Sequence, residues 1–158
     1  MNASDDIDFF YILENHGWST CYLSVEGQLY QLGPTHVFEN PIEVLLDSLV
    51  SILEGANEVS FKWHDEPGEY NWLITRNPEQ RHKVKISVTN CMHVGSSPPE
   101  FGTVDFEVKL KLFCVCVLRQ MDKIRDLMSE NSFKEHKEGE FPYPSFERFH
   151  QAYAREFS

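Results

Sequence analysis

A histidine close to three carboxylates is the pattern in this chain best suited to chemistry, and it lies in the segment Trp63-His64-Asp65-Glu66-Pro67-Gly68-Glu69. A histidine oriented by a carboxylate can act as a general base, so the segment is a candidate active site. Its flanks alternate between apolar and polar residues as strands do, and Pro67-Gly68 is typical of a turn. We therefore expect His64 to point away from the core and the carboxylates to lie at a hairpin tip open to water. This setting is poor for acid–base catalysis, and it favours a solvated tip or a protein-binding one.

The four cysteines could supply nucleophilic catalysis or metal binding. They are Cys21, Cys91, Cys114 and Cys116. None lies in a glycine-rich nucleophile turn, and catalysis would need a histidine that only the fold could bring close. Cys114 and Cys116 project to different sides of a helix, so they are poorly placed to bind one metal ion together. We predict buried thiols, no catalytic residue, no metal site and no cofactor, and thus a protein that is not an enzyme.

Strands must position most of these groups. Alternation of apolar residues predicts two or three short strands over 9–13, 18–25 and 28–32, with Glu26-Gly27 as a tight turn between the last two. Three more strands are expected between Glu58 and Thr89, and residues 94–102 read as a loop without regular structure.

The central hairpin has a predicted register. If Glu66 and Glu69 flank its turn, Trp63 lies opposite Trp72, and Phe61 opposite Ile74. The large apolar side chains then share one face, which we expect to be the core side of a sheet.

Three helices are expected around the strands. One spans Asn40 to Glu54, with Asn40 as N-cap, proline at the first helical position and Gly55 as the stop. The pattern over 104–128 is ambiguous, since it alternates as a strand does at its start and has helical spacing throughout. Length favours a helix from about Phe106 to Glu130, with a strand at its start as the alternative. A short helix over 145–156 follows, in a C-terminal extension that spans 131–158.

Together these elements predict one α+β domain over residues 1–158. We expect a largely antiparallel sheet of five or six strands whose apolar face packs against the 40–54 helix and the long C-terminal helix. Residues 1–7 are expected to be a disordered end. The N-terminus has neither the basic nor the apolar region of a signal peptide, and no stretch has the roughly 18 apolar residues of a membrane span, so we expect a cytoplasmic protein.

Charge is distributed very unevenly along the chain. The first seventy residues hold 13 carboxylates and a single basic residue, Lys62, for a net charge of −12, while the remaining 88 hold 12 carboxylates and 13 Lys and Arg, for a net charge of +1. A surface this negative repels nucleic acid and anionic lipid and attracts basic proteins. No glycine-rich phosphate loop and no basic aromatic face is present. We therefore expect a basic protein as partner, and neither nucleic acid nor membrane.

The chain resembles a family of small bacterial proteins. The resemblance spans roughly residues 20 to 155, and it lies in the 61–72 segment, in the long helix with Phe113 and Leu118-Arg119, and in Phe141-Pro142 before the last helix. These features are similar to those of the immunity proteins of polymorphic toxin and contact-dependent growth inhibition systems. The resemblance implies a cytoplasmic protein without enzymatic activity that binds and blocks a cognate toxin domain, often a basic nuclease.

Our leading hypothesis is thus an immunity protein that neutralises a basic toxin through an acidic surface. The rigid carboxylates of the N-terminal half are the predicted partner-binding residues: Asp47, Glu54, Asp65, Glu66 and Glu69. Two alternatives stay open. One is a small enzyme or ligand-binding domain with a pocket between sheet and helices, and the other is an acidic cytosolic protein, without a toxin partner, whose charge maintains solubility.

Overall fold

The computed structural model describes residues 5–37, 39–65, 68–91, 102–137 and 141–158, and these form an α+β fold, as predicted. The strands are β1 (Ile7–Leu13), β2 (Ser19–Val25), β3 (Gln28–Leu32), β4 (Glu58–His64), β5 (Glu69–Arg76), β6 (Lys83–Cys91) and β7 (Gly102–Lys109). The helices are α1 (Pro41–Leu53), α2 (Leu110–Leu127), α3 (Asn131–Lys134) and α4 (Tyr143–Phe157). Across the described ranges, no helix has the length and apolar character that crossing a membrane requires.

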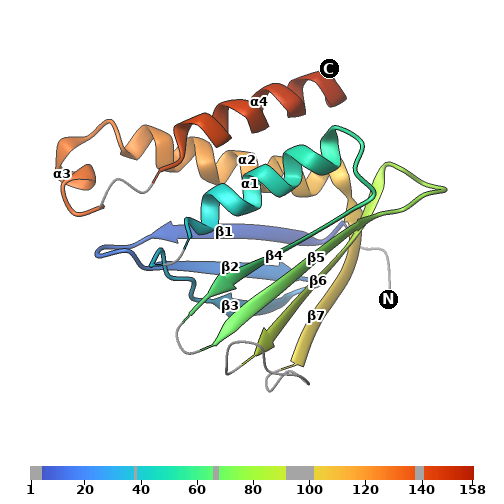
Figure 1. Cartoon of the computed structure of the whole chain (residues 1–158), viewed down its shortest axis with the longest axis horizontal. Helices are drawn as coiled ribbons and strands as arrows, with labels where there is room; N and C mark the ends of the chain where they lie inside the picture. The colour runs from blue at the N-terminus through green and yellow to red at the C-terminus, as the bar shows by residue number, and fades with distance from the viewer. Residues whose placement is uncertain (1–4, 38, 66–67, 92–101, 138–140) are drawn as a thin grey trace.

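The strands form two antiparallel sheets, so the predicted single sheet of five or six strands is wrong. One sheet has the order β1-β2-β3 and the other the order β4-β5-β6-β7 (Figure 1). Their inner faces meet: the rings of Tyr11 in β1 and Trp63 in β4 contact edge to face, with centroids 6.0 Å apart. Alternation shows which residues face a core, but it does not show which strands pair when a helix such as α1 separates them.

The three long helices lie along one side of the two sheets (Figure 1). Helix α1 packs against β4 and α4, and α2 packs against β1. Helix α2 also covers the edge of β1, because the Gln120 side-chain oxygen accepts a hydrogen bond from the backbone N–H of Tyr11 at 3.3 Å. One core therefore joins both sheets and the helices. Its largest fully buried side chains include Phe9, Tyr11, Trp63, Trp72, Phe106, Phe113, Phe146 and Phe149.

The central hairpin differs from prediction in register but not in orientation. Trp63 pairs with Tyr70 and Phe61 with Trp72, because the ladder ends at His64 and Glu69 rather than at Glu66. A shift of two residues leaves every side chain on its predicted face. Trp63 and Trp72 are each 1% exposed, with ring centroids 5.0 Å apart.

The ambiguous segment contains both kinds of structure. Residues 102–109 form β7, so a helix from Phe106 is wrong and the alternative of a strand at the start is correct. Phe106 and Val108 are buried opposite Ile86 and Val84 of β6, and these cross-strand contacts outweigh the helical spacing of the same residues. Residues 94–101 of the predicted loop lie outside the described part of the chain, and Gly102 begins β7.

Both ends of α1 follow the sequence prediction. The Asn40 side-chain oxygen accepts hydrogen bonds from the N–H groups of Ile42 and Glu43 at 3.0 and 3.2 Å. Gly55 has a φ of 114°, the left-handed region that favours glycine after a helix.

The two ends of the chain contact the rest of the fold. Of residues 1–7, the structure describes the last three, where Asp5 pairs with Lys109 at 3.2 Å and β1 begins at Ile7. At the other end, α4 packs on α1 and buries Phe146 and Phe149.

Arg76 fixes the helices to the four-stranded sheet. Its side chain is 7% exposed, and the guanidinium donates hydrogen bonds to the carbonyls of Arg81 at 2.7 Å and Ile52 at 2.9 Å. It also pairs with the Glu156 carboxylate at 3.1 Å. One cation thus joins β5 to the ends of α1 and α4.

Candidate functional site

Two of the predicted partner-binding residues are engaged within the chain. Asp47 and Glu54 lie on α1 and its C-terminal end, where they face α4. The Asp47 carboxylate pairs with Arg148 at 3.1 Å, and the Glu54 carboxylate pairs with Arg155 at 3.5 Å. Their charges are therefore partly neutralised by the fold itself, which the one-sided charge of the N-terminal half did not indicate.

The predicted exposed hairpin tip is wrong for Glu69. This residue begins β5 and is 1% exposed, and its carboxylate lies 3.7 Å from the Lys62 ammonium. A buried carboxylate is held inside the structure and is a poor anchor for an approaching partner. Glu66 lies outside the described residues. Asp65 lines a pocket between the two sheets, and among the predicted residues that the structure describes it alone reaches a candidate ligand site.

The register tests whether His64 lies close enough to a cysteine thiol for nucleophilic catalysis. His64 and Cys91 flank Glu69 on neighbouring strands, so the three form one row on the outer face of the four-stranded sheet. The backbones of His64 and Cys91 are therefore two strand spacings apart, about 10 Å. Direct proton transfer between the imidazole and the thiol requires hydrogen-bond contact at about 3 Å. Among the described residues, no group of three or more His, Cys, Asp or Glu is placed to hold a metal ion.

The other thiols are not activated either. All four cysteines are free; three are buried and Cys116 is half-buried. Burial raises the pKa of the Cys21 and Cys114 thiols well above the ordinary value, and it also raises that of Cys116. These thiols therefore stay protonated and weakly nucleophilic at neutral pH.

Known proteins provide no further guide to the site. No family model, no curated protein and no solved structure matches this chain. Function must therefore be argued from the surfaces and pockets of the molecule.

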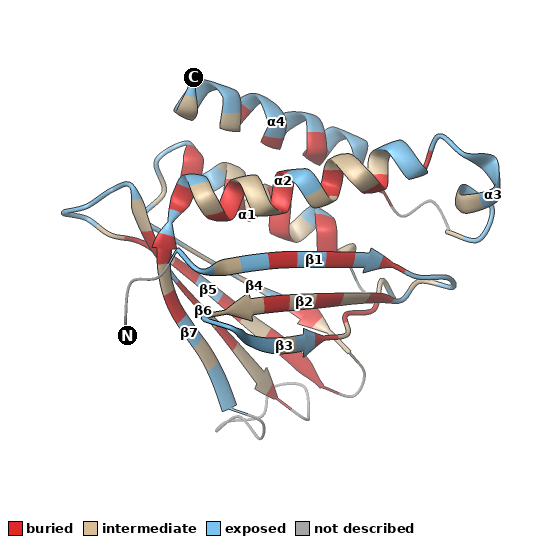
Figure 2. Cartoon of the chain, turned by 180° about the vertical axis from the view of Figure 1, so that it is seen from behind, coloured by how far each residue is buried: buried red, intermediate tan, exposed pale blue. Residues whose placement is uncertain are grey.

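A surface that the sequence did not single out lies on the three-stranded sheet. The side chains pointing away from the core form the open face, defined as Asp8, Phe10, Ile12, Thr20, Tyr22, Ser24, Leu29 and Gln31. The sheet lies in front of the four-stranded sheet in Figure 2, and no other helix or strand of the described residues crosses its outer side. Phe10, Ile12 and Leu29 are 44%, 39% and 63% exposed. Such apolar side chains on one sheet face are typical of a surface that binds another molecule.

Cross-strand pairing gathers the apolar groups at the centre of the open face. Phe10 pairs with Tyr22, with ring centroids 6.4 Å apart, and Ile12 pairs with Thr20 in the next row. The Lys123 ammonium of α2 lies 4.5 Å from the centroid of the Phe10 ring, and its pKa is lowered by burial. The aromatic pair is thus held in place at the border with α2.

Carboxylates surround this apolar centre, and basic residues are rare near it. Residues 1–61 contain no Lys or Arg, so the strands of the three-stranded sheet carry none. The exposed carboxylates around the open face are Asp8 on β1, Glu14 after β1 and Glu26 in the β2–β3 turn. The open face therefore combines apolar side chains with an excess of carboxylates over cations.

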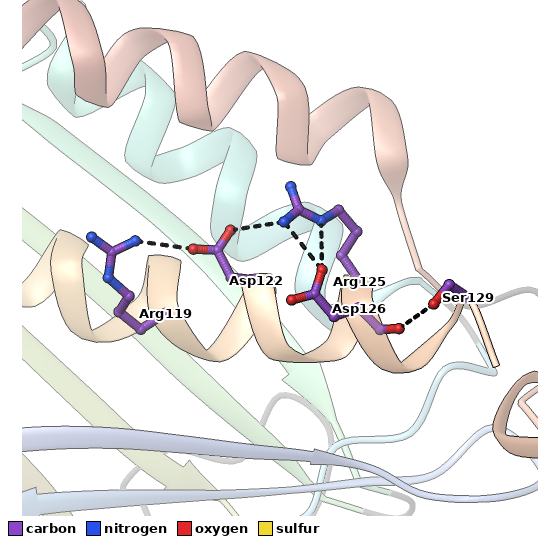
Figure 3. A network of polar contacts seen from close by, with 5 residues as sticks. All are labelled: Arg119, Asp122, Arg125, Asp126 and Ser129. Carbon is purple, nitrogen blue, oxygen red and sulfur yellow. Dashed lines mark hydrogen bonds and ion pairs between the residues drawn. The ribbon is translucent and has the colours of Figure 1, made fainter.

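Charges elsewhere in the molecule neutralise one another. On α2, Arg119 pairs with Asp122 at 3.0 Å, and Arg125 pairs with Asp122 at 3.8 Å and with Asp126 at 3.2 Å (Figure 3). On the outer face of the four-stranded sheet, Lys85 stands opposite Glu107. The open face differs from these surfaces in having more carboxylates than cations: Asp8, Glu14 and Glu26 lie around it, with the Lys123 ammonium at its border with α2.

A signal for this face is present in the sequence. Residues 9–13, Phe-Phe-Tyr-Ile-Leu, are apolar on both faces of a strand. Such a run normally indicates a strand buried on both sides. Here only Phe9, Tyr11 and Leu13 are buried, so the other two residues are available for a partner.

Proposed function

We propose that this protein is a protein-binding domain that holds a basic partner on the open face. The observation that carries this proposal is the exposure of Phe10, Ile12 and Leu29 on a sheet whose strands contain no Lys or Arg. Protein interfaces commonly have an apolar, aromatic centre and a polar rim, and opposite charge on the partner speeds the encounter. An aromatic pair in the centre provides the anchor, and Asp8, Glu14 and Glu26 provide the charged rim.

The resemblance to immunity proteins supports a toxin domain as the partner, bound in the cytoplasm. A toxin that acts on nucleic acid has a basic cleft, and a negative protein surface can occupy the place of the substrate phosphates. In this proposal the protein inhibits by covering that cleft and performs no reaction itself. The four free thiols accord with a reducing compartment.

The experiment uses the product of the gene directly upstream, since an immunity gene is expected to follow its toxin. Binding kinetics are measured at about 50 and about 300 mM salt, because screening weakens long-range attraction between exposed charges. We expect tight binding whose association rate falls at the higher salt. A partner that binds equally fast at both salts would contradict the role of the carboxylates, and no binding at all would overturn the toxin as partner.

Matched variants locate the surface. Phe10→Ala with Ile12→Ala should weaken binding at least about tenfold through faster dissociation, as expected for groups at the centre of an interface. Leu73→Ala is the control, because Leu73 has the same 39% exposure as Ile12 but lies on the outer face of the four-stranded sheet. If Leu73→Ala weakens binding and the Phe10 and Ile12 variant does not, the partner binds the other sheet. If neither does, the negative charge serves solubility and the open face is not the interface.

A further inference from the structure

A second site lies between the two sheets, away from the helices. It is a pocket of about 520 Å³, lined by β2 and β3 on one side and by β5, β6 and β7 on the other. This volume falls within the range of about 300 to 1,000 Å³ that is usual for small-molecule sites. The alternative of a small enzyme or ligand-binding domain expected a pocket between sheet and helices. The observed pocket lies between the two sheets instead.

Most of the lining is apolar. Leu23 and Leu32 contribute from the three-stranded sheet, and Val88 and Val104 contribute from the four-stranded sheet. The aromatic ring of Tyr30 is also part of the wall. These side chains suit an organic body rather than a hydrated ion.

One charged group is present among the described lining residues, the Asp65 carboxylate. No Lys or Arg lines the pocket, and no ion pair of the described residues includes Asp65. The segments left undescribed contain no Lys or Arg in their sequence, so they bring no such cation to it. A half-buried carboxylate in an apolar wall is stabilised by any cation that reaches it.

Tyr70 fixes the polar end of the pocket. Its hydroxyl oxygen accepts a hydrogen bond from the backbone N–H of Gly33 at 3.1 Å, which joins the end of β3 to β5. Burial raises the pKa of Tyr70 to about 12, and the Asp65 carboxylate contributes to the rise. The hydroxyl therefore stays protonated at neutral pH. Since a carboxylate has about four acceptor positions, Asp65 can accept hydrogen bonds from a ligand.

We infer that this pocket binds an organic ammonium group carried on an apolar body, with the ammonium at Asp65 and the body between the leucines and valines. This site does not depend on the proposed function, because the ammonium group binds at Asp65, which is not part of the open face, although Leu29 and Gln31 of β3 line the pocket as well as the open face. The ammonium can belong to a free amine or to a lysine side chain of a partner, and the two sources can be distinguished by experiment.

The first arm compares three indoles of similar size with different charge: tryptamine, 3-indoleethanol and indole-3-propionate. Affinities are measured by calorimetry, and the site is located by NMR shifts of the Gly33, Val88 and Val104 amides. We expect tryptamine to bind at least about tenfold more tightly than the neutral alcohol, because only its ammonium can form a charge-assisted hydrogen bond with Asp65. The acid should bind most weakly, because its carboxylate is repelled by that of Asp65. Equal affinity of all three compounds, or shifts elsewhere on the protein, would overturn the inference.

The second arm uses variants. Asp65→Asn keeps the shape of the side chain and should remove the preference for tryptamine over the alcohol. Asp105→Asn is the matched control, because Asp105 is an exposed carboxylate on the outer face of β7 and should leave that preference unchanged. A preference that survives in Asp65→Asn would show that this carboxylate is not the ammonium site.

The third arm identifies the source of the ammonium. N-acetyl-lysine N-methylamide represents a partner's lysine side chain. Tighter binding of tryptamine supports a free amine, and tighter binding of the lysine derivative supports a partner's side chain, while failure of both to bind defeats the inference. The Phe10→Ala and Ile12→Ala variant should bind these compounds as the natural protein does, so this test and that of the proposed function can fail separately.

Discussion

The three-stranded and four-stranded sheets each bury one face, but they differ in what they leave on the other. The four-stranded sheet exposes polar groups that pair across strands, such as Thr89 with Thr103, whose hydroxyls are 3.0 Å apart, and Lys85 opposite Glu107. The three-stranded sheet exposes more large apolar side chains, namely Phe10, Ile12 and Leu29, whereas Leu73 is such a side chain on the four-stranded sheet. A face whose polar groups pair with one another gains little from a partner, whereas exposed rings are stabilised when a partner covers them.

The two sheets also differ in how they hold the core. The four-stranded sheet carries both large buried indoles, Trp63 and Trp72, and the Trp63 N–H donates to the Pro41 carbonyl of α1 at 3.0 Å. We therefore assign folding stability chiefly to the four-stranded sheet and recognition chiefly to the three-stranded sheet. Mutations in either sheet test this division.

The largest effect is expected from Trp63→Ala, and Trp72→Ala should be similar. Removing a buried indole leaves a cavity, so each change should lower the free energy of unfolding by about 3–5 kcal/mol. Urea unfolding followed by far-UV circular dichroism measures this. Phe10→Ala is the control from the other sheet, and because its ring is 44% exposed the loss should be much smaller. Equal losses of unfolding free energy for Trp72→Ala and Phe10→Ala would contradict the assignment of stability chiefly to the four-stranded sheet.

Arg76→Met should have the next largest effect. The variant keeps much of the apolar stem but loses two hydrogen bonds to carbonyls and the ion pair with Glu156. We expect a loss of about 2–3 kcal/mol, because buried hydrogen bonds to a charged group contribute more than exposed ones. Thermal unfolding measures it, and Arg148→Met, an exposed arginine of α4, is the control. If the two variants have the same melting temperature, Arg76 does not join the helices to the sheet.

A pH effect is expected from His36, beside the three-stranded sheet. Its Nε2 lies 2.7 Å from the Ser19 hydroxyl, and burial lowers its pKa from 6.5 to about 4. Below pH 6.5 the unfolded chain takes up a proton that the folded protein does not, so acid favours unfolding. The contribution of the uncharged His36 ring to stability is fully present above pH 6.5 and is lost as the pH falls towards 4. Because the ring is only partly buried, we expect this loss to be about 1–2 kcal/mol.

Urea unfolding of the natural protein and of His36→Gln at pH 7 and pH 5 isolates this contribution. The natural protein should lose more stability than His36→Gln between the two pH values, while His82→Gln, at an exposed position, should behave like the natural protein. An unchanged pH dependence in His36→Gln would show that His36 does not control acid sensitivity.

Local patterns predicted much of the fold, because they depend on neighbouring residues. The cap at Asn40 and the turn at Glu26-Gly27 are confirmed; both turn residues have positive φ, 51° and 82°. Pairing between distant segments was not predictable in this way. A two-residue slip in the central hairpin leaves all faces unchanged, so alternation could not exclude it, and the same alternation could not divide the strands into two sheets.

The candidate site was predicted less well, for a physical reason. Formal charge in a sequence does not show which carboxylates meet a cation in the fold. Asp47 and Glu54 meet arginines that lie about one hundred residues further along the chain, and Glu69 is buried by its place in the ladder. Asp65 was singled out as a carboxylate for a partner, and it lies instead where two sheets leave a pocket.

The smallest effects are expected where the sequence first placed the interface. In the ion pairs Asp47–Arg148 and Glu54–Arg155 the side chains are 45–64% exposed, and such pairs contribute at most about 1 kcal/mol each. Asp47→Asn and Glu54→Gln should therefore change the free energy of unfolding by about 0.5 kcal/mol or less.

Since each carboxylate already faces an arginine, the double variant should also bind the partner as fast as the natural protein. Asp8→Asn with Glu26→Gln removes the same amount of charge from the rim of the open face, and it should slow association at low salt. If the α1 variant slows association and the rim variant does not, the partner binds α1 and α4, and the open face has another role.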